Sequence, residues 1–192
     1  MPGRARREQI VEAAHAVILE KGLAEASARD VARRLGVGSG LIHHYFKTWT
    51  SLRAEVVRVF ALKEIKALES DLAETPADRL AARLVDWMVQ DPEFLHWRLW
   101  LDALDEARRD SALAEVVEAA YLQWHGALVE LIERIVEEGG GACADPQGGA
   151  WRLSALIDGL VGLLVFERTP LTSGAVAELL ETQLANELRN GA

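Results

Sequence analysis

The residues with the clearest chemistry lie between residues 27 and 49, where two short helical patterns are joined by a turn that contains glycine. Ser27 followed by Asp30 is a capping pattern, so we expect a helix to begin at Ser27. Glycine in the joining turn ends this helix, and a second helix of about two turns follows from near Gly38 or Ser39. This arrangement predicts a helix-turn-helix, whose second helix enters the major groove of DNA.

The outward face of the second helix combines small residues with polar rings. Ser39 and Gly40 at its start let the backbone approach a groove closely. His43 and His44 can reach phosphates or base edges. An ordinary pair of packed helices is the alternative interpretation.

The charge of the chain changes sign along its length. Residues 1–53 hold nine Lys and Arg against five Asp and Glu, whereas the remainder holds twelve against twenty-five, and the whole chain has a net charge of −9. A local basic surface can still bind phosphate by releasing counterions. The basic residues expected on this surface are Arg4, Arg6, Arg7, Arg29, Arg33, Arg34 and Lys47. For Arg33 and Arg34, a solvated helix face is the alternative.

Residues 4–53 resemble the N-terminal DNA-binding domain of the TetR family of bacterial transcriptional regulators. The resemblance is carried by R-x-x-I-V-x-A-A from Arg7 to Ala14 and by G-V-x-x-G-x-I-x-H-Y-F from Gly36 to Phe46, which is nearest to the BetI-like branch. It implies a helix-turn-helix domain at residues 1–49 and a helical effector-binding and dimerisation domain at residues 50–192.

The resemblance also implies which residues contact DNA. Those implied to touch DNA are Ser27, Ser39, His43, His44 and Tyr45, with Arg29 as a base reader. Gly38, Gly40 and Lys47 complete the predicted interface. The family usually has Ser or Thr at Gly38, Tyr at His43 and Lys at Trp49, so we expect an unusual operator preference.

Helical patterns continue to the end of the chain, and no segment alternates with the period of a strand. Thr50 is expected to cap a helix reaching about Asp71, and Thr75-Pro76 opens one that ends near Gln90, where Asp91-Pro92 breaks it. Later helices are expected at about 94–108, 111–138, 150–168 and 173–189. The sequence therefore predicts an all-α protein with three N-terminal helices and about six in a larger domain.

The last two of these helices have broad apolar faces, and we expect them to form a self-complementary dimer surface. In the TetR family two such helices from each subunit make a four-helix bundle, and the resemblance implies the same here. The residues expected in the interface are Leu156, Leu160, Leu163, Val176, Leu180 and Leu184. Packing of both helices on their own domain is the alternative.

Aromatic residues concentrate in three consecutive helices of the acidic part of the chain. The resemblance implies a small-molecule effector in this domain, and the BetI-like branch is associated with choline. Rings flanked by carboxylates suit a quaternary ammonium ion. The candidate ligand-binding residues are Trp97, Trp100, Tyr121, Trp124, His125 and Asp158. An ordinary aromatic core is the alternative.

Nothing in the sequence favours an enzyme, a metal site or a cofactor. His43 and His44 point about 100° apart on a helix, so they cannot jointly hold one metal ion. No H-E-x-x-H, G-x-S-x-G or P-loop occurs. The apolar run from Leu153 to Phe166 contains Asp158 and is short, so we expect no membrane span and a cytoplasmic protein. The one cysteine, Cys143, leaves a redox role open.

These observations predict a ligand-responsive transcriptional regulator. We expect a homodimeric repressor that binds a palindromic double-stranded DNA operator and is released by a small-molecule effector. The alternative is a helical scaffold or protein-interaction module without specific DNA binding.

Overall fold

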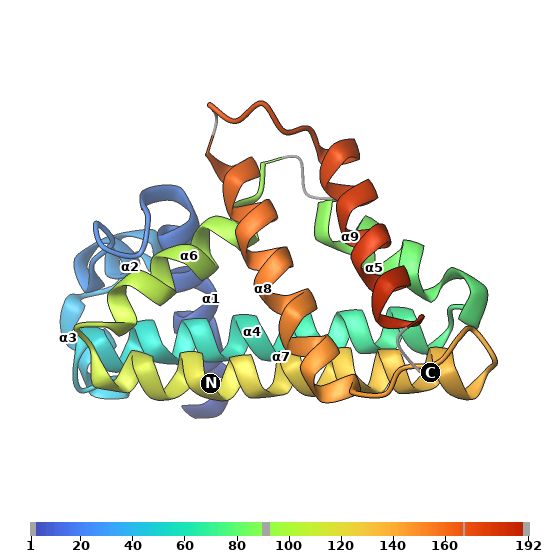
Figure 1. Cartoon of the computed structure of the whole chain (residues 1–192). Helices are drawn as coiled ribbons and strands as arrows, with labels where there is room; N and C mark the ends of the chain where they lie inside the picture. The colour runs from blue at the N-terminus through green and yellow to red at the C-terminus, as the bar shows by residue number, and fades with distance from the viewer. Residues whose placement is uncertain (1–2, 90–92, 167, 190–192) are drawn as a thin grey trace. The chain divides into compact units, whose positions relative to one another are not determined.

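The computed structural model describes residues 3–89, 93–166 and 168–189, and within them every regular element is a helix (Figure 1). These residues divide into two compact units. The first contains the residues up to Leu62 together with Arg98–Ala120, and the second contains Lys63–Trp97 together with the residues from Tyr121 onward. The all-α fold expected from the sequence is confirmed. A functional division after residue 49 stays a prediction.

The first unit begins with three helices: α1 (Gly3–Lys21), α2 (Ala28–Leu35) and α3 (Ser39–Tyr45). Ser27 caps α2, because its hydroxyl oxygen accepts a hydrogen bond from the backbone N–H of Asp30 at 3.3 Å. Gly36 ends α2 in the left-handed conformation, with φ 65°, and leads the chain into the turn before α3. Since α2 packs against both α1 and α3, the predicted helix-turn-helix is present.

Six further α-helices and one 3-10 turn follow within the described residues. They are α4 (Trp49–Ala73), η1 (Ala77–Arg79), α5 (Leu80–Val89), α6 (Leu95–Ala107), α7 (Ser111–Glu137), α8 (Pro146–Val165) and α9 (Ser173–Glu187). Gln90, Asp91 and Pro92, where we expected one helix to end, lie outside the described residues.

Two helices start earlier than the sequence suggested. Helix α4 begins at Trp49 because Thr48 caps it, its hydroxyl accepting from the N–H of Ser51 at 3.0 Å. Helix α8 begins at Pro146 because the Asp145 carboxylate accepts from the N–H of Gly148 at 2.9 Å. Proline suits the first position of a helix, so the glycines that follow it belong to the first turn of α8 rather than to a loop.

Each unit has its own apolar core. In the first unit the largest fully buried side chains are Ile10, Ile18, Leu23, Ile42, Leu52 and Leu113. In the second unit one buried cluster draws on α4, α5, α7, α8 and α9. Helix α9 packs beside α8 and α5 in this unit (Figure 1).

An ion pair between a buried carboxylate and a half-exposed guanidinium fixes the end of α9 to the first half of α8. The Glu187 side chain is 2% exposed and accepts from Nε and NH2 of Arg152 at 2.8 and 2.7 Å. Gln183 also donates to this carboxylate at 2.6 Å. These donors, Arg152 first among them, hold the pKa of Glu187 below its usual range despite its burial.

Candidate DNA-binding and effector sites

The nine residues expected to contact DNA all have accessible surface in the first unit. Those that are exposed are Arg29, Gly38, Ser39, Gly40, His43, His44 and Lys47, and those that are half-buried are Ser27 and Tyr45. On the other side of α3, Ile42 is buried, and so is Phe46, which follows the helix. The helix-turn-helix therefore presents the predicted face to solvent.

Two of these residues are glycines that the fold itself does not require. Apart from the neighbouring backbone, a Cβ atom added at Gly38 or Gly40 would meet no atom of the described residues within 4 Å, and neither glycine has a positive φ. Glycine inside a helix is less stable than alanine by about 0.5–1 kcal/mol. The bare backbone at the start of α3 therefore leaves space for a partner outside the chain, as close approach to a DNA groove requires.

Most basic side chains of residues 3–62 are already paired with a side chain of the same unit. Arg7 lies 2.5 Å from Glu55 and Arg34 lies 2.6 Å from Glu20. Arg6 makes no ion pair in this described segment but donates to the side chain of Gln9 at 3.2 Å. By contrast, Arg29 and Lys47 make no ion pair there and are exposed. Their charges are available to phosphate without breaking an existing contact.

The hydroxyl of Ser27 is engaged within α2. It donates a hydrogen bond to Oδ2 of Asp30 at 2.5 Å in addition to capping the helix. Because phosphate oxygens only accept hydrogen bonds, Ser27 would have to give up this bond to contact DNA. Its contact with DNA stays a prediction.

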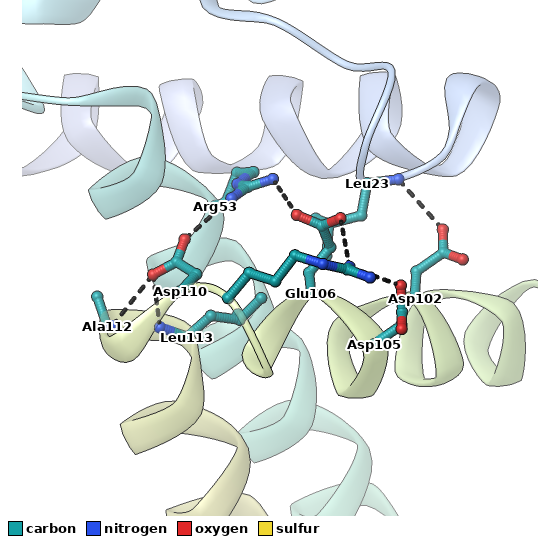
Figure 2. Close-up of polar contacts among 9 residues, drawn as sticks. Leu23, Arg53, Asp102, Asp105, Glu106, Asp110, Ala112 and Leu113 are labelled. Atoms are coloured by element: carbon teal, nitrogen blue, oxygen red, sulfur yellow. Dashed lines mark hydrogen bonds and ion pairs between the residues drawn. The ribbon is translucent and has the colours of Figure 1, made fainter.

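A polar cluster that the sequence did not predict surrounds Arg53 in the first unit (Figure 2). Arg53 lies in the first turns of α4, and its NH1 and NH2 atoms lie 3.0 Å from Glu106 and 2.9 Å from Asp110. The three side chains are 12%, 23% and 9% exposed, respectively. Removing one member of such a buried ion pair leaves an uncompensated charge and costs about 3–5 kcal/mol.

Three hydrogen bonds from backbone N–H groups extend this cluster along α6 and α7 (Figure 2). Asp110 accepts from the N–H groups of Ala112 and Leu113 at 3.1 and 3.2 Å, and so caps α7. Asp102 on α6 accepts from the N–H of Leu23 at 3.2 Å. The loop after α1 and the beginning of α4 are therefore both held by carboxylates that come from α6 and the start of α7.

The six residues expected to bind an effector do not all fall in one unit. Trp100 belongs to the first unit, and the other five belong to the second. Trp97 donates from Nε1 to the carbonyl of Met88 at 3.3 Å, and Trp97 and Trp124 pack against the apolar cluster of the second unit. These two rings therefore contribute to the core.

Polar groups gather where α7 faces α8 in the second unit. The Tyr121 hydroxyl donates to the carboxylate of Asp158. The His125 side chain is buried, donates from Nε2 to the carbonyl of Gln147 at 3.1 Å, and stacks on the ring of Trp151 with centroids 4.2 Å apart. Trp151 was not predicted from the sequence.

Asp158 is the strongest candidate for a ligand anchor. Burial raises the pKa of its carboxyl group, and Tyr121 offsets this only in part. Ser154, one helical turn earlier, is 2% exposed, and its hydroxyl has no hydrogen-bond partner among the described residues. Asp158 makes no ion pair within the described part of the chain, so its charge is compensated only by a neutral phenol.

Part of the predicted dimer surface has to be corrected. Val176, Leu180 and Leu184 are at most 1% exposed and belong to the apolar core of their own unit. Leu156 and Leu160 are half-buried against the same core, and Leu163 is 47% exposed. The apolar face of α9 therefore packs inward, as the alternative interpretation held.

A short capped helix followed by an exposed reading helix, with free cations beside it, defines a helix-turn-helix DNA-binding protein. Residues 10–56 match the family model of bacterial regulatory proteins of the tetR family, and residues 76–189 match that of the BetI-type transcriptional repressor, C-terminal. The chain belongs to the TetR family of bacterial transcriptional regulators and has a C-terminal domain of the BetI type. Members of this family are regulators rather than enzymes.

Two sequence relatives agree with this assignment, and two solved structures share the fold. The regulator BetI of Stenotrophomonas maltophilia is 29% identical, over 81% of this chain and 79% of that protein. PksA of Bacillus subtilis is 27% identical, over 81% and 76%. A transcriptional regulator from Saccharomonospora viridis, solved in complex with choline, has a TM-score of 0.85 at 23% identity and covers 96% of this chain and 98% of that chain. One from Pseudomonas aeruginosa has a TM-score of 0.78 at 24% identity, covering 97% and 91%.

Substituting Gly40→Ala should separate folding from DNA binding. Beyond the neighbouring backbone, the new methyl group meets no atom of the described residues within 4 Å, and the substitution removes a helical glycine, so the melting temperature should stay the same or rise. Affinity for operator DNA, measured by fluorescence anisotropy, should fall at least about tenfold because the methyl group occupies the space needed for close approach. Gly174→Ala is the matched control, since Gly174 also follows a serine at the start of a helix. Unchanged DNA affinity in Gly40→Ala would remove the close-approach argument.

Substituting Arg53→Met should destabilise the protein by about 3–5 kcal/mol, because Glu106 and Asp110 lose their common cation while remaining buried. Thermal melting measures the loss. Arg108→Met is the control, because Arg108 is 78% exposed and its nearest carboxylate lies 4.0 Å away. Equal effects of the two substitutions would show that the Arg53 cluster is not structurally important.

Proposed function

We propose that this regulator is a homodimeric repressor that binds a palindromic operator and is released from it by a small cationic effector. DNA binding rests on the exposed face of α3 and on the two unpaired cations near it. Arg29, Ser39, Gly40, His43, His44 and Lys47 form the proposed contact surface, with Gly38 and Tyr45 at its edge. Arg29 and Lys47 neutralise phosphates, and the residues of α3 read the groove.

The dimer is proposed to form through the outward side of α8. Four residues on this side repeat at four-residue spacing, as one face of a helix does, and all are exposed: Trp151, Ala155, Gly159 and Leu163. Phe166, which directly follows the helix, is also exposed. Small residues in the middle of this stripe allow the α8 helices of two subunits to approach closely. On α9, Leu179 is 45% exposed and is proposed to contact the partner, whereas Val176, Leu180 and Leu184 are buried.

The apolar character of α8 has a second interpretation. Among the described helices, α8 is the one that is long and apolar enough to cross a membrane, by length and composition alone. About a third (33%) of its apolar stretch is buried. Its inward side packs in the core of the second unit and carries Asp158 at the edge of that face. We assign the outward side to a second copy of the chain, and the protein to the cytoplasm, where the DNA is.

The effector is proposed to be a cation that binds beside Asp158. This carboxylate is largely removed from water and lacks a positive partner within the described residues, so a cation there would supply the compensation that the fold does not. The ring of Tyr121 and the stacked pair of His125 and Trp151 add aromatic surface. Choline is a suitable probe, because a relative of the same fold was solved with it.

Release from DNA is a linkage between two binding reactions. The effector favours a conformation whose reading helices do not match successive major grooves, which lie about 34–36 Å apart along one face of the duplex. DNA favours the matching conformation, so each ligand lowers the affinity of the other by the same factor.

The dimer proposal is tested by Leu163→Glu. A carboxylate in the middle of the interface costs several kcal/mol when it is buried without a partner, which corresponds to at least about a hundredfold weaker association. Because Leu163 is exposed in the single chain, the variant should stay folded and light scattering should show half of the wild-type mass. Leu122→Glu, at a 59% exposed leucine of α7, should remain dimeric. A wild-type protein with the mass of one chain would disprove the dimer.

The effector proposal is tested with the DNA that flanks the protein's own gene. Choline should raise the melting temperature of the wild-type protein and release this DNA in a gel shift, whereas its neutral carbon analogue 3,3-dimethylbutan-1-ol should do neither. In Asp158→Asn both effects of choline should be lost while DNA binding is kept. Loss of DNA binding in this variant, or an equal response to the neutral analogue, would contradict the proposed role of Asp158.

The same variant carries a pH signature. Since burial raises the pKa of Asp158, its ionised form lowers the free energy of unfolding near neutral pH, and protonation relieves this cost as the pH falls. Asp158→Asn should therefore melt at the same or a higher temperature than the wild type near pH 7. This advantage should shrink toward about pH 4, near the usual range of a carboxyl group.

A further inference from the structure

Asp30 accepts from three different side chains, more than any other carboxylate within residues 3–62, where Glu55 accepts from the two side chains of Arg7 and Arg58. Its Oδ1 atom lies 2.6 Å from Nζ of Lys21 and 3.2 Å from NH1 of Arg33, and its Oδ2 atom accepts from Ser27 at 2.5 Å. A single carboxylate therefore holds the end of α1, the cap of α2 and the last turn of α2. Both cations and the hydroxyl are types of group that bind phosphate.

The Asp30 contacts differ from an ordinary surface ion pair. Its side chain is 12% exposed, whereas the carboxylates of Glu8 and Glu20, which pair with Arg4 and Arg34, are 60% and 59% exposed. The hydrogen bonds from Lys21 and Ser27 lower the pKa of Asp30 to about 2, so the carboxylate stays ionised throughout the physiological range.

The cations that Asp30 holds are themselves accessible. The Lys21 and Arg33 side chains are 43% and 77% exposed, so either could turn toward a phosphate if the carboxylate released it. Both residues are among the nine Lys and Arg counted in residues 1–53, yet the structure neutralises them locally. The net charge counted from the sequence therefore overstates the positive charge that this surface offers to DNA.

We propose that Asp30 restrains sequence-independent DNA binding by keeping Lys21, Arg33 and the hydroxyl of Ser27 from the phosphate backbone. The first helix of a helix-turn-helix crosses that backbone while the second helix reads bases. Each cation that reaches a phosphate strengthens binding to any sequence by releasing counterions. Asp30 leaves Arg29 and Lys47 as the cations that contact phosphate and so favours the operator over random DNA. This inference rests on DNA binding by the helix-turn-helix.

Asp30→Asn is the direct test, because asparagine keeps the shape and a hydrogen-bond acceptor but removes the charge. Binding to a random-sequence duplex is measured by fluorescence anisotropy between about 50 and about 200 mM salt. The variant should bind several-fold more tightly, and the slope of log K against log salt should steepen by roughly one to two, at about 0.9 per added phosphate contact. Operator affinity should rise less, so selectivity should fall.

A double-mutant cycle identifies the cation responsible. Lys21→Gln should change the affinity for random DNA less than twofold in the wild-type background, because its charge is already neutralised. In the Asp30→Asn background the same substitution should reverse much of the gain. Lys47→Gln is the matched control and should weaken binding in both backgrounds, because Lys47 makes no ion pair within residues 3–62.

Two outcomes would overturn the proposal. One is an Asp30→Asn variant that melts near the wild-type temperature and binds random DNA with the same affinity and salt slope. The second outcome applies if Asp30→Asn does not fold. It is a double variant, Lys21→Gln with Arg33→Gln, that loses as much affinity for random DNA as Lys47→Gln does. A wild-type protein that binds no duplex even at low salt would instead disprove DNA binding itself.

Discussion

The buried guanidinium of Arg53 is the interaction on which the geometry of the first unit depends. It follows the reading helix α3 by eight residues and binds carboxylates that lie 53 and 57 residues later in the chain. Asp110 gives one oxygen to Arg53 and the other to the first turn of α7. A buried guanidinium or carboxylate without a partner of opposite charge is destabilising. The start of α4, the end of α6 and the start of α7 are therefore fixed together.

Helix α8 combines two surfaces with different requirements. Its inward residues, Leu153, Ile157 and Val161, are at most 1% exposed and stabilise the second unit by removing apolar surface from water. Its outward residues Ala155 and Gly159 have small or no side chains and contribute little to that core. Asp158 lies at the edge of the buried face, where a carboxylate is costly for stability, and costs of this kind are common at binding sites.

The sequence predicted the starts of α2 and α9 well, but it placed those of α4 and α8 a few residues too late because Thr48 and Asp145 were not recognised as their caps. Ser27, Gly36 and Thr172 act within one helical turn, so α2 and α9 begin within one residue of the predicted position. The α9 residues Val176, Leu180 and Leu184 were assigned to the wrong surface, because an apolar stripe has the same period whether it faces its own core or a partner. The Arg53 cluster had no local signal, since its members are separated by more than fifty residues.

The distribution of charge shows a similar limit of prediction from the sequence. The excess of basic residues in residues 1–53 was evident from counting, but its electrostatic effect depends on which cations already have a carboxylate nearby. Arg7 and Arg34 are paired, and Arg53 is committed to the interior, so each adds to the formal charge without offering it to DNA. A regulator must find one site among many random ones, and selectivity requires that sequence-independent attraction stay modest. Pairing most cations within the fold is one way in which a strongly charged sequence meets that requirement.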